Sequence, residues 1–228
     1  MKTVPSEIGQ LKELRSLYLE DNYIKELPDA MSNLSKLTTL SLNNNLLSEI
    51  PSVVLKLEKL NYLYLGDNLI AQLPADLASL GNLQELYLYS NNIREIPPSI
   101  KELKSLRLLY LNDNLLKSLP EEIGFLINLR VLMVDDNKLS QLPNTFSGMS
   151  NLKTLQITNN NLSSFPQVIN KMTSLRTVFL DNNRIENIPN SYESMKNLKT
   201  LSVKRLNLSE QEEQDLLISL PSVKVYFD

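Results

Sequence analysis

A repeat of 23 residues runs through this chain and restricts its fold more than any other feature does. The leucines that open successive copies keep this spacing: Leu14, Leu37, Leu60, Leu83, Leu106, Leu129, Leu152, Leu175 and Leu198. A unit this short cannot bury an apolar face alone, so the copies must stack on one another. Nearly ten copies fit into the 228 residues. The sequence therefore predicts one elongated domain over residues 1–228.

Each copy follows the frame L-x-x-L-x-L-x-x-N-x-L-x-x-L-P, as in residues 60–74. The L-x-L alternation predicts a short strand with one buried face. The third residue after this alternation is an asparagine, whose side chain can satisfy backbone groups of a turn. Repeated along the stack, these asparagines are expected to form a ladder of such bonds; they are Asn22, Asn45, Asn68, Asn91, Asn114, Asn137, Asn160 and Asn183. The prolines that follow predict a convex segment of loops, 3₁₀ turns or short helical turns; they are Pro5, Pro28, Pro51, Pro74, Pro97, Pro120, Pro143, Pro166 and Pro189.

The two ends depart from the frame. The asparagine position is taken by Leu206, and Ser209 with Glu212 then predicts a capping box that opens a helix through about Ser219. Leu216, Leu217 and Leu220 are the candidate core residues of this helix, and Leu220, Val223 and Val225 repeat the strand frame once more. We expect a partial repeat over residues 1–13, about eight and a half repeats over 14–208, and a cap over 209–228. The partial first repeat predicts an open sheet edge that favours self-association.

This frame is that of the leucine-rich repeat, and the chain resembles members of that family. It is most similar to small bacterial leucine-rich repeat proteins of the spirochaete type, in its ending from Leu208 to Phe227, and less closely to Ras-suppressor-type scaffolds. The resemblance implies an α/β repeat solenoid, an arc with a concave parallel sheet. It also implies a protein-binding module that is secreted or surface-exposed and acts on host molecules, although Met1–Gln10 does not read as a signal peptide.

Composition removes several classes of function. The chain has no Cys, His or Trp, so thiol nucleophiles, the usual general base and the commonest metal ligand are missing. We expect no enzyme activity, no cofactor and no metal. The net charge of −3 argues against nucleic acid as a partner. No apolar run is long enough to predict a membrane span.

Aromatic side chains gather at the strand positions that should face the concave side. They are Tyr18, Tyr62, Tyr64, Tyr87, Tyr89, Tyr110 and Phe179, with Leu108 and Met133 in the same columns. Large side chains on a sheet stabilise their cross-strand neighbours, which is one interpretation. Tyrosine also supplies contact area at low entropic cost in binding surfaces. We favour binding, because a solvated sheet face has no need of aromatic residues.

Charged residues are sorted to the two sides of this face. Acids precede the ladder asparagine at Glu20, Asp21, Asp67, Asp113, Asp135, Asp136 and Asp181, and cations follow the opening leucine at Arg15, Arg107, Arg130, Lys153, Arg176 and Lys199. Shared ancestry of the repeats explains such stripes equally well; if functional, they would orient a partner. Asp113, Asp135 and Asp136 are expected to lie close together, but no calcium-loop spacing accompanies them.

These columns define one candidate site and three hypotheses for its function. The first is a non-catalytic protein–protein interaction module. The second is a glycan-binding protein that uses the tyrosine and acid face, and the third is a structural or self-associating repeat protein. The candidate partner-binding residues are Tyr18, Tyr62, Tyr64, Glu85, Tyr87, Tyr89, Leu108, Tyr110, Asp113, Met133, Asp135, Asp136 and Phe179.

Overall fold

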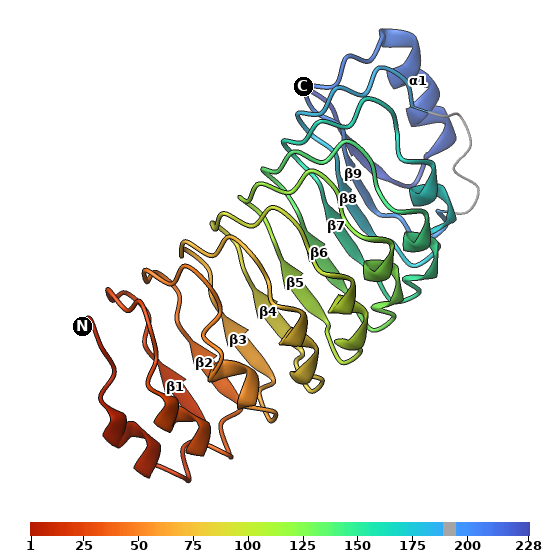
Figure 1. Ribbon diagram of the computed structural model, residues 1–228. Coiled ribbons are helices and arrows are strands. Elements are labelled where there is room, and N and C mark those ends of the chain that lie inside the picture. The colour runs from red at the N-terminus through yellow and green to blue at the C-terminus, as the bar shows by residue number, and fades with distance from the viewer. Residues whose placement is uncertain (189–194) are drawn as a thin grey trace.

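A computed structural model describes residues 1–188 and 195–228, which form a curved stack of repeats with the strands in one row (Figure 1). Within the described residues, ten parallel strands lie in sequence order in one open sheet. Their bounds are Ser16–Tyr18 (β1), Thr39–Ser41 (β2), Tyr62–Tyr64 (β3), Glu85–Tyr87 (β4), Leu108–Tyr110 (β5), Val131–Met133 (β6), Thr154–Gln156 (β7), Thr177–Phe179 (β8), Thr200–Ser202 (β9) and Lys224–Tyr226 (β10). The expected solenoid arc with a concave sheet is confirmed.

Short 3₁₀ helices form a second row on the convex side (Figure 1). They are Ser6–Gln10 (η1), Asp29–Asn33 (η2), Val54–Lys56 (η3), Ala75–Ser79 (η4), Pro98–Glu102 (η5), Glu121–Phe125 (η6), Asn144–Gly148 (η7) and Gln167–Lys171 (η8). A frame proline directly precedes all of them except η3, and even there the Pro51 carbonyl accepts a hydrogen bond from the Val54 amide at 2.9 Å. Proline starts these turns because its φ is already fixed near −70°. Pro189 lies outside the described residues.

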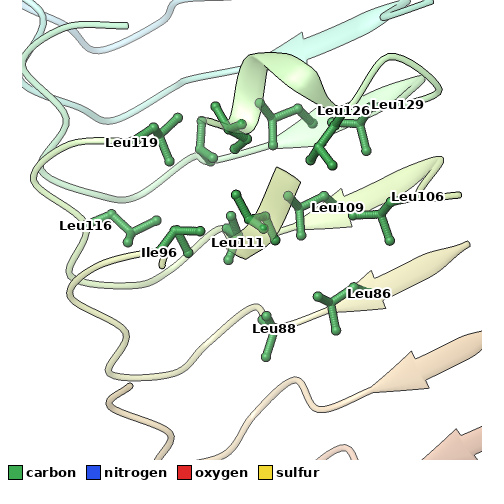
Figure 2. Packing of buried hydrophobic residues seen from close by; sticks show 14 of the residues in the cluster. Leu86, Leu88, Ile96, Leu106, Leu109, Leu111, Leu116, Leu119, Leu126 and Leu129 are labelled. Carbon is green, nitrogen blue, oxygen red and sulfur yellow. The ribbon is translucent and has the colours of Figure 1, made fainter. Parts of the chain in front are cut away.

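Leucines fill the space between the sheet and the 3₁₀ helices. Leu86 and Leu88 lie below Leu109 and Leu111 of the next repeat, so each layer of side chains rests on its neighbour (Figure 2). All four are fully buried. Truncating a buried leucine to alanine typically costs about 2–5 kcal/mol, because the neighbours cannot close the cavity. The repeat spacing thus creates one continuous core along the solenoid.

The frame asparagines form the expected ladder. The Asn114 side chain donates to the carbonyls of Leu111 at 3.1 Å in its own turn and Leu88 at 2.9 Å in the preceding repeat. Its Oδ1 accepts from the Ile93 amide at 2.9 Å. The same pattern recurs from Asn45 to Asn183. Each buried amide therefore satisfies backbone groups that the turn would leave unpaired.

A second asparagine ladder, which the sequence did not lead us to expect, runs along the opposite edge. The side chains of Asn82, Asn128, Asn151 and Asn197 each donate to a carbonyl 24 residues earlier, at 2.8–2.9 Å. These asparagines directly precede the opening leucine of their repeats. Their recurrence at that position was the signal available in the sequence.

The C-terminal cap has the predicted helix, α1 (Glu210–Ser219), with the predicted capping box between Ser209 and Glu212. Leu216 and Leu220 are buried, but Leu217 is 43% exposed, so its assignment to the core was wrong. Residues four apart share one helix face, whereas the next residue points about 100° away. In the part of the chain that the structure describes, no helix is long and apolar enough to cross a bilayer.

The register of the last strand differs from the expected one. Val225 pairs with Leu201 and Tyr226 with Ser202, whereas the frame had placed Val223 opposite Leu201. The paired residues are 24 positions apart, whereas the expected alignment of Val223 with Leu201 implied 22. The segment between β9 and β10 contains α1, where earlier repeats have a short 3₁₀ helix. The shift moves Tyr226 into the same column as Tyr64.

Candidate functional site

Three tyrosines from adjacent strands touch on the concave face. The register aligns Tyr64 of β3 with Tyr87 of β4 and Tyr110 of β5. The Tyr87 ring lies 4.8 Å from Tyr64, edge-on, and 4.3 Å from Tyr110, tilted by 31°. All three side chains are half-buried. We call these residues, with Tyr62 and Tyr89 beside them, the tyrosine cluster.

Tyr89 belongs to the cluster through an unusual backbone contact. Its ring centroid lies 6.5 Å from that of Tyr87, and its ring atoms lie where a Cβ on Gly66 would be, at 2.4–2.6 Å. Gly66 has no positive φ, so a turn does not require glycine there. The absence of a side chain at position 66 is what lets the Tyr89 ring pack against the backbone of the neighbouring repeat.

Three hydroxyl groups of the cluster, those of Tyr64, Tyr87 and Tyr89, have a raised pKa. Burial, followed by the nearby Glu85 carboxylate, raises the pKa of Tyr64 to about 12. Burial and the adjacent Tyr110 raise the pKa of Tyr87, and burial and Asp67 raise that of Tyr89. The Tyr64 hydroxyl donates weakly to Glu85 at 3.4 Å. The face thus offers neutral rings and hydrogen-bond donors.

The other apolar candidates lie at different distances from the cluster. Met133 follows Tyr110 in register, and Leu108 lies on β5 beside Glu85 of β4, so these three residues flank the cluster. Tyr18 is separated from Tyr64 by the strand that carries the buried Ser41, and it is 62% exposed. Phe179 is separated from Met133 by β7. Tyr18 and Phe179 therefore lie on the same face but outside the cluster.

Backbone conformation accounts for much of the acidic stripe. The residue before each ladder asparagine has a positive φ near 50°, in the left-handed region that asparagine and aspartate tolerate best. Asp113 and Asp136 occupy this position, together with Asp21, Asn44, Asp67, Asn159 and Asn182. Turn geometry by itself therefore favours aspartate at these positions.

Asp135 has a different structural role. Its Oδ1 accepts a hydrogen bond from the Thr158 amide at 2.8 Å, as Asn43 does from Gly66 and Asp181 from Lys204. Each of these side chains adds one hydrogen bond between neighbouring repeats just after the strand ends. Burial, with a smaller contribution from the adjacent Asp136 carboxylate, raises the pKa of Asp135 to about 6.

The three central acids lie close together, as expected, because the Asp113 amide donates to the Asp135 carbonyl at 2.9 Å. Their carboxylates nevertheless make separate contacts. The Asp113 carboxylate accepts from Ser90 at 2.9 Å and that of Asp136 from Asn159 at 2.7 Å, so each serves its own local contact. Across residues 1–188 and 195–228, no group of three or more acidic side chains is placed to hold a metal ion.

Tyr226 is an aromatic residue of this face that the sequence analysis missed. It lies on β10 next to the buried Ser202, whose other neighbour is Phe179. The ammonium groups of Lys224 and Lys204 lie 4.8 and 5.6 Å from its ring centroid. The signal was present as an aromatic in the last strand, but the wrong register hid its column.

Comparison with known proteins agrees with this geometry. A family model described as "Leucine-rich repeat region" matches residues 2–90 and 98–224, and one described as "Leucine Rich Repeat" matches residues 82–103. None of the curated proteins matches the chain.

Solved structures of similar fold come from bacteria and plants. A leucine-rich repeat protein of Leptospira interrogans is 28% identical, with a TM-score of 0.70 over 100% of this chain and 70% of that one. An internalin of Listeria monocytogenes is 24% identical, with a TM-score of 0.75 over 99% and 70%. A plant peptide hormone receptor, in complex with RGF2, is 28% identical, with a TM-score of 0.69 over 91% of this chain and 38% of that one. The chain belongs to the leucine-rich repeat family.

Proposed function

We propose that this protein is a non-catalytic module that binds a protein partner on its concave face. The observation that carries the proposal is the contact of Tyr64, Tyr87 and Tyr110 in one half-buried row. Neutral tyrosine rings that already pack on one another present a rigid apolar surface with hydroxyl donors at its margin. Such surfaces are typical of binding hot spots.

The size of the face is sufficient for a stable complex. Ten strands span roughly 40 Å at about 4.8 Å between neighbours. A standard interface takes about 800 Å² from each partner. Tyr62, Leu108 and Met133 widen the apolar centre along neighbouring strands, and Glu85 and Tyr89 border it.

The similar proteins support an interaction function and a bacterial source. The plant receptor was solved in complex with RGF2, so a related fold at 28% identity binds a partner. The likeness to the Leptospira interrogans protein supports a bacterial module that is secreted or displayed on the cell surface and meets host molecules. Immunolabelling of intact cells of the source organism would test the location, and a signal seen only after lysis would contradict it.

The decisive test removes the ring contacts. We expect Tyr64, Tyr87 and Tyr110→Ala together to abolish capture of the partner from host extracts, and Tyr87→Ala alone to cost at least about 1–2 kcal/mol of binding. Tyr23→Ala is the matched control, because Tyr23 is 64% exposed and lies outside the strands. Circular dichroism checks that every variant is folded. Equal capture by the triple variant and the natural chain would contradict the proposal.

Gly66→Ala provides a second test that leaves every tyrosine in place. The added methyl group collides with the end of the Tyr89 ring and not with backbone, so we expect the ring to shift and the surface to change shape while the fold is retained. We expect weaker partner binding without a matching loss of thermal stability. Unchanged affinity would place Tyr89 outside the interface.

Glycan binding remains the alternative for the same face. Sugars stack on ring faces, but Tyr87 and Tyr110 cover part of each other's faces at a centroid distance of 4.3 Å. This arrangement favours a protein partner. Glycan-array binding that is lost in the triple tyrosine variant would establish the alternative instead. Self-association through β1, the first strand of the sheet, predicts a mass that rises with concentration in light scattering.

A further inference from the structure

Five consecutive repeats place a cation at the same position, just before the strand. The residues directly before β5 to β9 are Arg107, Arg130, Lys153, Arg176 and Lys199. The residues directly before β2, β3 and β4 are instead Thr38, Asn61 and Gln84. We call the five residues the cation row. The position is therefore not a uniform copy of one ancestral repeat, because three successive neutral repeats separate these five cations from Arg15 in the same column.

The cations of the row have no carboxylate partner in the described part of the chain. The ion pairs there join Lys36 to Glu13 and Lys104 to Glu102. Four of the five row residues are exposed and Lys153 is half-buried. Like charges on neighbouring strands repel one another, so the row is retained against a small cost in stability.

A hollow of about 300 Å³ opens between the first two cations. Its walls are neutral polar groups and guanidinium groups, without a carboxylate, from Gln84, Ser105, Arg107, Asn128, Arg130 and Asn151. The second asparagine ladder holds this wall in place, since Asn128 and Asn151 are bonded to carbonyls of the preceding repeats. A fixed polar hollow beneath two arginines suits the head of an anion, because arginine donates in a fork that matches a carboxylate.

Exposed apolar side chains lie directly beside the hollow. Phe125 and Ile127 are 53% and 52% exposed and line an adjoining depression with Lys101, Glu102 and Lys104. Exposed apolar groups bordered by polar residues often mark sites where another molecule binds. A polysaccharide or a nucleic acid has no aliphatic side chain to bury against them, whereas a polypeptide has.

We propose that the cation row, with the hollow at Arg107 and Arg130, binds an acidic segment of a polypeptide in an extended conformation. The row runs along the solenoid for roughly 20 Å, which about six residues of extended chain cover. The carboxylates of the bound segment pair with the cations of the row, and one apolar side chain of the segment packs against Phe125 and Ile127. This site is separate from the tyrosine cluster and does not depend on it.

The test is fluorescence anisotropy with a labelled oligoglutamate peptide that carries one phenylalanine. We expect binding that weakens with salt, and a loss of about tenfold or more in Arg107→Gln/Arg130→Gln, since each charge-assisted contact is worth about that factor. Arg15→Gln is the matched control: it removes a cation from the same column beyond the neutral repeats, and binding should not change.

Three outcomes would overturn the proposal. The first is equal affinity of the double arginine variant and the natural chain, and the second is no peptide binding at low salt. The third is binding of a sulfated oligosaccharide, but not of the peptide, through Arg107 and Arg130, which would assign the row to anionic glycans. Tyr87→Ala separates this site from the concave face, because we expect it to leave peptide affinity unchanged.

Discussion

Neighbouring acidic residues of this chain are fixed by different physical requirements. Asp136 occupies a left-handed backbone position, where a short polar side chain lowers the cost. Asp135, one residue earlier, is half-buried and accepts the Thr158 amide at 2.8 Å. An asparagine performs the same task at position 43. The hydrogen bond, and not the negative charge, is therefore what this position needs.

Asp135→Asn should stabilise the protein at neutral pH. The folded-state pKa of Asp135 is raised to about 6, above its unfolded value near 3.9, so its contribution to stability is full below about pH 4 and is lost as pH rises to 6. We expect the variant to gain up to about 3 kcal/mol over the natural chain across that range.

Urea unfolding at a series of pH values measures this gain. A difference for Asp135→Asn that does not change between acid and neutral pH would contradict the assigned burial of its charge.

The convex elements pack closely enough that a single methyl group matters. A Cβ on Gly124 of η6 would lie 2.4–2.5 Å from Thr145 of η7. Thr145 cannot move away easily, because its hydroxyl donates to the Glu121 carbonyl at 2.6 Å. On Gly148, at the end of η7, a Cβ would meet the Gly124 carbonyl at an ordinary 3.5 Å. The spacing of adjacent 3₁₀ helices is thus set at particular residues.

Gly124→Ala should destabilise the fold by about 1–3 kcal/mol, the usual cost of overpacking. Gly148→Ala has the same chemical change without the clash, so its effect should stay within about 0.5 kcal/mol. Thermal unfolding of the two variants side by side measures the difference. Equal midpoints would show that η6 and η7 slide apart freely.

Each repeat of the whole molecule contacts mainly the repeats beside it, so stability depends on covering the two ends of the stack. At the C-terminal end, α1 buries Leu216 and Leu220, and β10 pairs with β9. The Asp228 carboxylate accepts from the Arg205 amide at 3.1 Å, in a place where earlier repeats use a backbone carbonyl. The cap thereby covers the end of the core and supplies hydrogen-bond partners to the repeat that contains β9.

Removing residues 209–228 should lower stability and expose the β9 edge to association. Burial of Leu216 and of Leu220 stabilises the fold by about 1.5–3 kcal/mol each, and the truncation removes both contributions. Light scattering should show that the truncated chain forms larger species than the natural chain does as concentration rises. A truncated chain with the same thermal midpoint and mass as the natural one would contradict this role.

The sequence by itself determined the repeat architecture, because a periodic frame of leucine, asparagine and proline has one way to bury its apolar faces. Leu63 and Leu109, the Asn114 ladder and the Pro74 turn were all predictable from position within the frame. The tyrosine columns were predictable for the same reason, since strand residues alternate between two faces.

Only the tertiary structure decided features that depend on how one repeat meets the next. The register of β10, which follows the cap helix α1, places Tyr226 beside Ser202. The ring of Tyr89 reaches the cluster only because Gly66 of the neighbouring repeat leaves room for it. The carboxylates of Asp113, Asp135 and Asp136 make separate hydrogen bonds although their backbones are adjacent, because backbone φ and local partners direct each side chain. A frame fixes positions along the chain, whereas contacts between side chains of different repeats depend on distances that the frame does not contain.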